Sequence, residues 1–269
     1  MYSRFNFKPS VYFYNSMLNK HLSAGSELFE SHQKEVQNCL AKYISVDGVI
    51  NGTNLKNDWF SISNKNIFIS HSHKDINRVK AFAGWLHEEF GLTAFIDSCC
   101  WGYCDELLKK IDDKYCYNHE TKTYDYNLRN YTTSHVHMML STALTEMIDK
   151  TECIIFFNTP NSINMKTELD KIERKEIAET ESPWIYHELF VTSVLEQRRQ
   201  ARILAESIRN TFTDSSLQIS HDVEKYLKKL TPLTEDNLIE WERTWNTQKK
   251  TGVQTLALDL LYQIISKKE

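Results

Sequence analysis

The chain has 269 residues, of which 41% are hydrophobic, with a net charge of −4 and a pI near 6.2. This is enough for one substantial core, or for one core with a smaller helical partner. No basic cluster alternates with aromatic residues, so nucleic acid is not expected as a partner. No apolar run could span a bilayer, and the first residues lack the apolar segment of a signal peptide. The six cysteines form no pair of CxxC motifs, which predicts a reduced, cytoplasmic protein.

Residues 1–64 are expected to form a helical N-terminal extension. Within it, residues 25–44 have the spacing of an amphipathic helix, with a stripe made by Leu28, Val36, Leu40 and Ile44. Three turn signals, Asp-Gly, Asn-Gly and Asn-Asp, follow between residues 47 and 58 and predict an irregular connector.

Residues 65–200 alternate short apolar runs with helical patterns. The runs suit strands buried on both faces of a parallel sheet. One helix is followed by Gly91 as a C-cap, and another has Ser182 as N-cap with Pro183 in its first position. The alternation predicts an α/β fold with a doubly wound parallel sheet. The expected strands are 67–69, 93–97 and 153–158, and the expected helices are 76–90, one beginning at 106, and 182–200.

Doubly wound sheets bind ligands beyond the carboxyl ends of their strands. Three segments at such ends are therefore expected to be loops that carry function: residues 70–75, 97–105 and 158–182. The long, tyrosine-rich stretch 112–137 is interpreted as an ordered insertion. Residues 201–269 are expected to form a helical C-terminal region, in which a threonine caps the helix around residues 235–245.

Two closely spaced histidines raise the question of a metal site. His71, His73 and Asp75 match the first five positions of the His-x-His-x-Asp-His run of metallo-β-lactamase-type hydrolases. The sixth position is Ile76, which begins the apolar stripe of the next helix, and Asp75 is well placed as that helix's N-cap. A second His-x-His pair at 135 and 137 could complete four nitrogen ligands. We expect no metal, and interpret these histidines as hydrogen-bonded loop residues near a pocket.

Three segments together resemble the Toll/interleukin-1 receptor (TIR) domain family. They are FISHSHKD at 68–75, FIDSCCWGYCD at 95–105, and CIIFFNTPNSI at 153–163 followed by SPWIYHEL at 182–189. The resemblance covers roughly residues 65–200 and implies a flavodoxin-like sheet. The second segment resembles the family's second strand and the BB loop after it. The chain departs from the family in its insertion, in a long charged spacer before residue 182, and in a fifth strand for which ARILAES (201–207) is the only candidate.

The resemblance implies either NAD+ consumption or a scaffold that binds other TIR domains, and the helix glutamate largely distinguishes the two. Here that residue is Glu188, which shares one helical face with Trp184 and Val191. The alternative interpretation is a solvated glutamate on a surface helix. One carboxylate suits the chemistry, because nicotinamide leaves NAD+ as a neutral molecule without a general acid.

We therefore expect an NAD+ glycohydrolase or cyclase with Glu188 as the catalytic residue, NAD+ as substrate and no cofactor. The resemblance also implies self-association through TIR–TIR contacts, an effector that senses the product, and a role in antiphage defence. Two alternatives stay open: a non-catalytic interaction module, and a metal-dependent hydrolase. The expected substrate-binding residues are Ser70, His71, His73, Asp97, Trp101 and Trp184.

Overall fold

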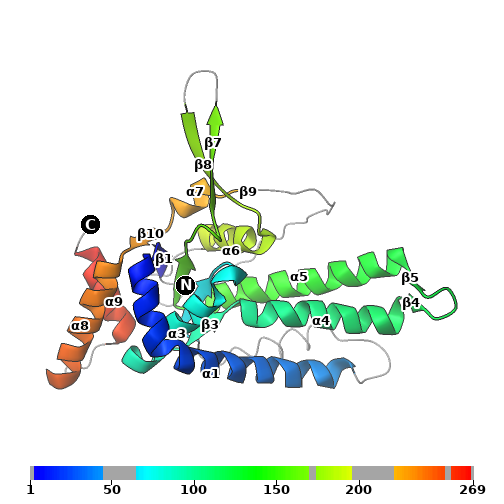
Figure 1. Cartoon of the computed structure of the whole chain (residues 1–269), viewed down its shortest axis with the longest axis horizontal. Helices are drawn as coiled ribbons and strands as arrows, with labels where there is room; N and C mark the ends of the chain where they lie inside the picture. The colour runs from blue at the N-terminus through cyan, green and yellow to red at the C-terminus, as the bar shows by residue number, and fades with distance from the viewer. Residues whose placement is uncertain (1–2, 45–64, 170–173, 196–220, 252–255, 268–269) are drawn as a thin grey trace. The chain divides into compact units, whose positions relative to one another are not determined.

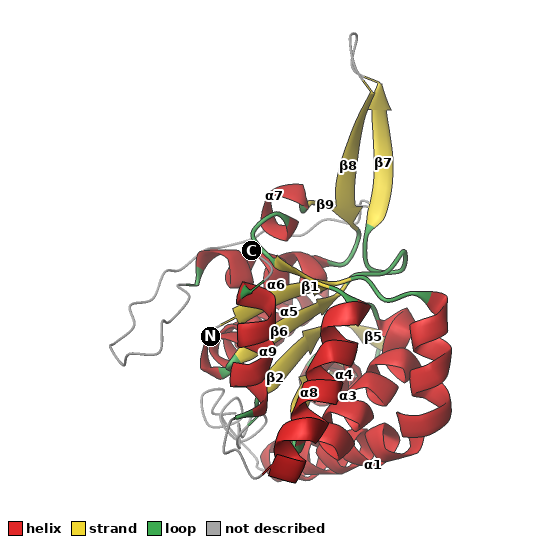
Figure 2. Ribbon diagram, turned by 90° about the vertical axis from the view of Figure 1, so that its left-hand side faces the viewer, coloured by secondary structure: helices red, strands yellow, loops and turns green. Residues whose placement is uncertain are grey.

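The chain folds around a five-stranded parallel sheet flanked by helices, with the strand order β10-β1-β6-β2-β3 (Figures 1 and 2). This confirms the predicted α/β class and is compatible with a flavodoxin-like fold. The strands are β1 (Ser3–Phe7), β2 (Ile67–Ser70), β3 (Ala94–Ile96), β6 (Cys153–Phe157) and β10 (Thr231–Leu233). The structure is a computed structural model that describes residues 3–44, 65–169, 174–195, 221–251 and 256–267.

The strand order shows where the chain departs from an ordinary flavodoxin-like sheet. A flavodoxin-like sheet has the strand order 2-1-3-4-5. Here β2, β3 and β6 correspond to strands 1, 2 and 3 of that pattern, because they are neighbours in the order β3-β2-β6. The fourth position is occupied by β1 from the N-terminal segment, and the fifth by β10. The segment 1–64 therefore supplies a strand in addition to its helix. The stretch 201–207, expected as the fifth strand, lies outside the described residues.

The chain divides into two compact units. The first comprises Met1–Pro9, Ser70–Lys74 and Glu152–Glu269, and the second comprises Ser10–Ile69 and Asp75–Thr151. In the first unit β1 pairs in parallel with β6 on one side, from Ser3↔Cys153 to Phe7↔Phe157, and with β10 on the other. Phe5 and Phe7 of β1 are buried, so this strand contributes to the core as well as to the hydrogen-bond ladder.

The helices of the second unit include a tight antiparallel crossing. Helix α1 (Val11–Ile44) packs on α3 (Ile76–Phe90) where Gly25 faces Gly84. A Cβ atom on Gly25 would lie 1.8 Å from the carbonyl oxygen of Lys80, so only glycine fits there. One helical turn to either side of the crossing, a pair of side chains connects the two helices. They are His21 with Glu88, at 2.5 Å, and Phe29 with the Lys80 ammonium, at 4.1 Å from the ring centre.

Both predicted helices are confirmed. Of the stripe expected on α1, Leu28 is half-buried, and the side chains of Val36, Leu40 and Ile44 lie outside the described residues. The apolar residues of α3 are buried apart from Ile76, which is half-buried, and Gly91 ends the helix in a left-handed conformation with φ 67°. The expected helix within 25–44 is confirmed, and begins earlier, at Val11.

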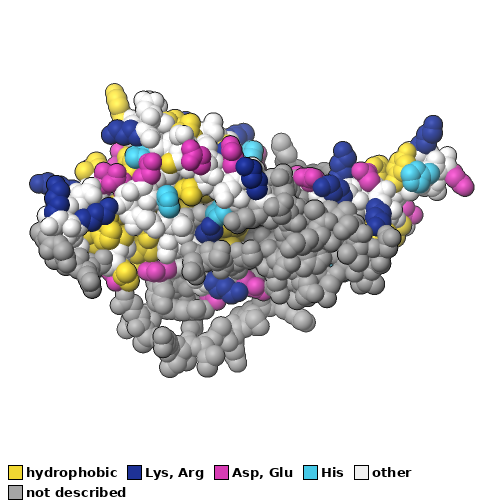
Figure 3. All heavy atoms as spheres, turned by 90° about the horizontal axis from the view of Figure 1, so that it is seen from below, with side chains coloured by type: hydrophobic (Ala, Val, Ile, Leu, Met, Phe, Trp, Pro, Cys, Tyr) yellow, Lys and Arg dark blue, Asp and Glu magenta, His cyan; other side chains and the backbone are white. Residues whose placement is uncertain are grey.

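Helices α4 (Ser98–Tyr115) and α5 (Tyr126–Lys150) form a long hairpin in the second unit (Figure 1). Its tip is a small β-hairpin of β4 (Tyr117–Asn118) and β5 (Thr123–Tyr124). The stretch interpreted as an insertion is therefore the outer part of two helices and their connection. Tyr126 and Tyr131 are 76% and 64% exposed. Figure 3 shows hydrophobic, histidine and charged side chains side by side at the end of this hairpin, on the right.

The remaining elements belong to the first unit. Strands β7 and β8 form an antiparallel hairpin whose base also pairs with β9, as Figure 2 shows. A reciprocal pair of hydrogen bonds between Thr234 and Asn237 caps α8, which confirms the predicted threonine cap. None of the described helices is both long and apolar enough to cross a bilayer. The elements are β7 (Asn164–Leu169), β8 (Arg174–Thr180), α6 (Pro183–Val194), β9 (His221–Asp222), α7 (Glu224–Leu227), α8 (Glu235–Thr251) and α9 (Ala257–Ser266).

A half-buried carboxylate just before β6 predicts a pH-dependent stability. Burial raises the pKa of Glu152, against the opposing effect of a 3.3 Å hydrogen bond from the Tyr262 hydroxyl. A raised pKa in the folded state means that the charged form costs stability above the ordinary carboxyl pKa and that this cost disappears below it. Glu152→Gln is therefore expected to raise the melting temperature at pH 7–8 and to leave it unchanged near pH 4. Thermal unfolding of both proteins across this range tests the prediction, and a difference that does not change with pH would contradict it.

Candidate functional site

Helix α6 begins at the residues that were predicted to start it. The Ser182 hydroxyl accepts a hydrogen bond from the amide of Ile185, and Pro183 is the first helical residue, where its missing N–H costs nothing. Glu188 lies in the second turn of this helix, and only 1% of its surface is exposed. It is therefore not the solvated glutamate of the alternative interpretation.

The carboxylate of Glu188 meets the last residue of β2. The Ser70 hydroxyl donates a hydrogen bond of 2.6 Å to Oε2 of Glu188, although the two residues are 118 positions apart in the chain. Ser70 is 2% exposed, so the contact is shielded from water at both ends. A hydroxyl that donates to an ionised carboxylate forms a short and comparatively strong hydrogen bond. The structure thus brings together Ser70 and Glu188, two of the residues predicted for the site.

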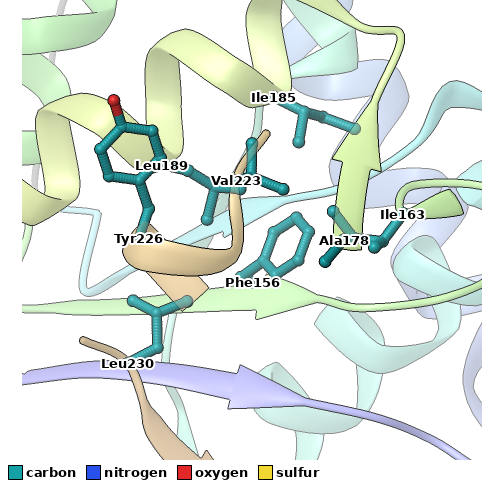
Figure 4. Close-up of a cluster of buried hydrophobic side chains, with 8 residues drawn as sticks. All are labelled: Phe156, Ile163, Ala178, Ile185, Leu189, Val223, Tyr226 and Leu230. Atoms are coloured by element: carbon teal, nitrogen blue, oxygen red, sulfur yellow. The ribbon is translucent and has the colours of Figure 1, made fainter. Parts of the chain in front are cut away.

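A cluster of apolar side chains packs against the helix that carries Glu188. Ile185 and Leu189 of α6 contact side chains from β6, β8 and the segment around α7, as Figure 4 shows. The Tyr186 ring also stacks on His221, with ring centres 4.1 Å apart, and a hydrogen bond with Tyr226 raises the pKa of Tyr186. Packing of this kind fixes the rotation of α6 about its own axis. The cluster consists of Phe156, Ile163, Ala178, Ile185, Leu189, Val223, Tyr226 and Leu230.

Two cationic side chains reach the carboxyl end of α6 from outside the helix. The Arg4 guanidinium of β1 donates to the carbonyl of Thr192 at 2.5 Å, and the Lys229 ammonium donates to the carbonyl of Ser193 at 3.3 Å. The last turn of α6 has no basic residue of its own. These two cations therefore bind its terminal carbonyls and compensate the partial negative charge at the C-terminal end of the helix dipole. Burial lowers the pKa of Arg4. Sequence reasoning missed both residues, because neither lies in a recognisable motif.

The other predicted site residues are placed differently. His71 is buried directly after Ser70, whereas His73 is exposed at the start of a 3-10 turn, and Trp184 is half-buried in the first turn of α6. Asp97 is buried in the second unit, where its carboxylate accepts from the amide of Ser98 at 2.7 Å. Trp101 lies in α4, and its side chain is outside the described residues.

Two of the three expected loops are regular structure. The prediction of a loop over 97–105 is wrong, because α4 begins at Ser98, with Asp97 capping its first amide. Cys104 and Leu107 are buried one turn apart, a helical spacing that the glycine and paired cysteines obscured. The prediction of a loop over 158–182 is also wrong, because most of it forms the β7–β8 hairpin. A turn in which the Ser162 hydroxyl accepts from the amide of Thr159 does end β6 as expected.

Two of the residues considered for a metal site make other contacts. Asp75 occupies the N-cap position of α3 but makes no capping bond. Its carboxylate instead pairs with Arg78 at 2.8 Å, which corrects the expected capping role. His135 is exposed and its ring lies against Tyr131, with centres 4.3 Å apart. Within the described residues, no three His, Cys, Asp or Glu side chains are grouped as metal ligands would be.

Comparison with known proteins adds no assignment. No family model matches the chain, and neither a curated protein nor a solved structure is significantly similar to it. The site therefore has to be interpreted from its own geometry. It consists of a buried carboxylate, held by a serine at the carboxyl end of a parallel strand and carried on a helix anchored at both ends. Such a carboxylate can accept hydrogen bonds from hydroxyl groups or stabilise a developing positive charge.

Proposed function

We propose that the chain is a TIR-type NAD+ glycohydrolase or cyclase in which Glu188 is the catalytic carboxylate. The observation that carries the proposal is the Ser70–Glu188 hydrogen bond, which links the first and last of the TIR-like segments at the carboxyl end of β2. Open α/β sheets bind ligands at this edge, next to the position where the strand order reverses. A glutamate with no such role is rarely buried this completely.

The proposed reaction needs one anion and no general acid. The bond between C1′ of the ribose and the pyridinium nitrogen breaks, and its electron pair neutralises the ring, so nicotinamide leaves uncharged. The sugar becomes oxocarbenium-like, and the Glu188 carboxylate stabilises that positive charge and accepts from the ribose hydroxyls. Water then forms the new C–O bond and loses a proton, giving ADP-ribose. An adenine nitrogen or a ribose hydroxyl in the place of water gives a cyclic isomer.

The surroundings of α6 support this assignment, because a catalytic charge is most effective when it is held in place before the reaction. Ser182 caps one end of the helix, and Arg4 and Lys229 bind the carbonyls at the other end. The apolar cluster packs along its side. A glutamate on the solvated face of a surface helix would not require the helix to be held in place by a cap, two cations and an apolar cluster.

The test is the release of nicotinamide by the purified full-length chain, at high protein concentration, measured by chromatography with mass detection. Glu188→Gln keeps the size and an acceptor for Ser70 but removes the charge, so turnover should fall by about 100-fold or more. Glu181→Gln is the matched control, because it makes the same change at an exposed position just before α6 and should behave like the wild type. Equal turnover in Glu188→Gln and the wild type would sink the proposal.

A non-catalytic interaction module is the second candidate. It is favoured by the exposed aromatic side chains at the tip of the α4–α5 hairpin, because tyrosine is enriched at protein interfaces. Sedimentation of the same sample separates the two. Ordered assemblies without nicotinamide release would favour the module over the enzyme.

For the enzyme, we further propose a cytoplasmic location, self-association, and a product that is sensed by an effector in antiphage defence. The buried free thiols of Cys104, Cys116 and Cys153 agree with a reducing compartment.

A further inference from the structure

Ser70 occupies a position where a hydroxyl needs a partner. The residues before it in β2, Ile67 to Ile69, are fully buried and apolar, and Ser70 continues this burial. Burying a hydroxyl without a hydrogen bond is unfavourable. The 2.6 Å contact with Oε2 of Glu188 satisfies it, with the serine hydroxyl as the donor.

The same hydrogen bond restricts the orientation of the Glu188 side chain. A glutamate side chain has three rotatable bonds, and a carboxylate on the second turn of α6 could take several orientations. Ser70 is the last residue of β2 and is 2% exposed, so packing holds its side chain in place. The hydrogen bond therefore restricts the orientation of the Glu188 carboxylate as well.

We propose that Ser70 is the positioning residue of the Glu188 carboxylate. It holds Oε2 in place, and it does not bind the phosphates or the ribose itself. This inference rests on the proposed function, and it changes the role that sequence reasoning gave to Ser70. Hydrogen-bond donors that orient a catalytic carboxylate act on the transition state more than on substrate binding.

The expected signature is a split between the kinetic constants. Ser70→Ala removes one oxygen atom, and kcat should fall about 10- to 100-fold, the effect of losing a hydrogen bond to a charged group, while KM changes less than about twofold. Ser70→Thr restores the hydroxyl and should recover most of kcat. Ser141→Ala makes the same change at a half-buried position of α5, outside the three TIR-like segments, and should leave both constants unchanged.

A double-mutant cycle of unfolding free energies, with Ser70→Ala and Glu188→Gln, measures the contact independently of activity. A nonzero coupling energy is expected.

The outcomes separate this inference from the proposed function. If the wild type is active and Ser70→Ala keeps its kcat, the positioning role is overturned and the enzyme stands. If Ser70→Ala and Ser70→Thr lose kcat equally while both stay folded, the hydroxyl is not what matters and the inference also fails. A wild type that releases no nicotinamide overturns both, and the cycle then reports only a structural hydrogen bond.

Discussion

Gly25→Ala is expected to destabilise the protein by about 3 kcal/mol or more, although alanine is the better helix former by ~1 kcal/mol. The added methyl group would sit 1.8 Å from the Lys80 carbonyl oxygen and 3.2 Å from the amide nitrogen of Gly84. Backbone atoms of a helix cannot turn aside as a flexible side chain can. Helices α1 and α3 must therefore separate, which disturbs the His21–Glu88 and Phe29–Lys80 contacts on either side of the crossing.

Urea unfolding of variants at three glycines and one serine measures this effect. Gly84→Ala should act in the same direction, since its Cβ would meet the His21 carbonyl oxygen at 2.3 Å. Ser23→Ala lies on an exposed position of α1 and should change stability by less than about 0.5 kcal/mol. Gly91→Ala adds a methyl group where no atom lies within 4 Å, so its cost is that of the left-handed backbone alone, about 1 kcal/mol. If Gly25→Ala and Ser23→Ala had the same free energy of unfolding, the two helices would not be packed as described.

Removal of residues 1–9 is expected to abolish cooperative folding of the chain. These residues contain β1, which pairs on both edges, so its loss exposes the ladders of β6 and β10 together. It also removes the buried rings of Phe5 and Phe7, and replacing a single buried phenylalanine by alanine costs about 3–5 kcal/mol. The sum approaches or exceeds the whole stability of a typical domain, about 5–15 kcal/mol. The Arg4 contact with the end of α6 is lost as well.

Circular dichroism with thermal unfolding of the truncated chain tests this prediction. Phe7→Leu offers a graded comparison, because it keeps an apolar side chain in the core and should lower stability by only about 1–2 kcal/mol. A chain that begins at residue 65, the start of the TIR-like resemblance, is also expected not to fold. A truncated chain that melts like the full-length protein would mean that β1 adds little to the sheet.

The parts of the fold that the sequence could predict are those with strong local signals. The apolar runs at Ile67–Ile69 and Cys153–Phe157 are short and bounded by polar residues, which is typical of strands buried on both faces of a parallel sheet. The periodic stripe and terminal Gly91 defined α3, and the Ser182-Pro183 pair defined the start of α6. Each of these features depends on residues within a few positions of one another.

The missed elements lack such signals or carry weak ones. Strand β1 has the alternating pattern of Arg4, Phe5, Asn6 and Phe7, but it is short, and a similar pattern is common in loops. Strand β10 is three residues long and contains a proline, which ordinarily argues against a strand. The β7–β8 hairpin is rich in charge, and its pairing depends on the partner strand rather than on its own residues.

The candidate site shows the same limit. Glu188 and Ser70 could each be selected from their segments, and the flanking pattern suggested that Glu188 would lie beside buried surface. That their side chains meet could not be derived, because the contact spans 118 positions and depends on where a helix lies over a sheet. The anchoring of α6 by Arg4 and Lys229 was hidden for the same reason.

The central place of β1 has a consequence for how the protein is made. Residue Phe5 pairs with residue Ile155 on one edge and with Thr231 on the other, so the ribosome synthesises this strand long before either neighbour. At about 5–20 residues per second, the interval before β10 appears is roughly 10–45 s. During that time Phe5 and Phe7 have no sheet to enter, and a nascent chain that exposes an unpaired apolar strand is prone to association. Cellular yield should therefore depend on chaperones that bind the early chain, and on anything fused in front of residue 1 that shields it.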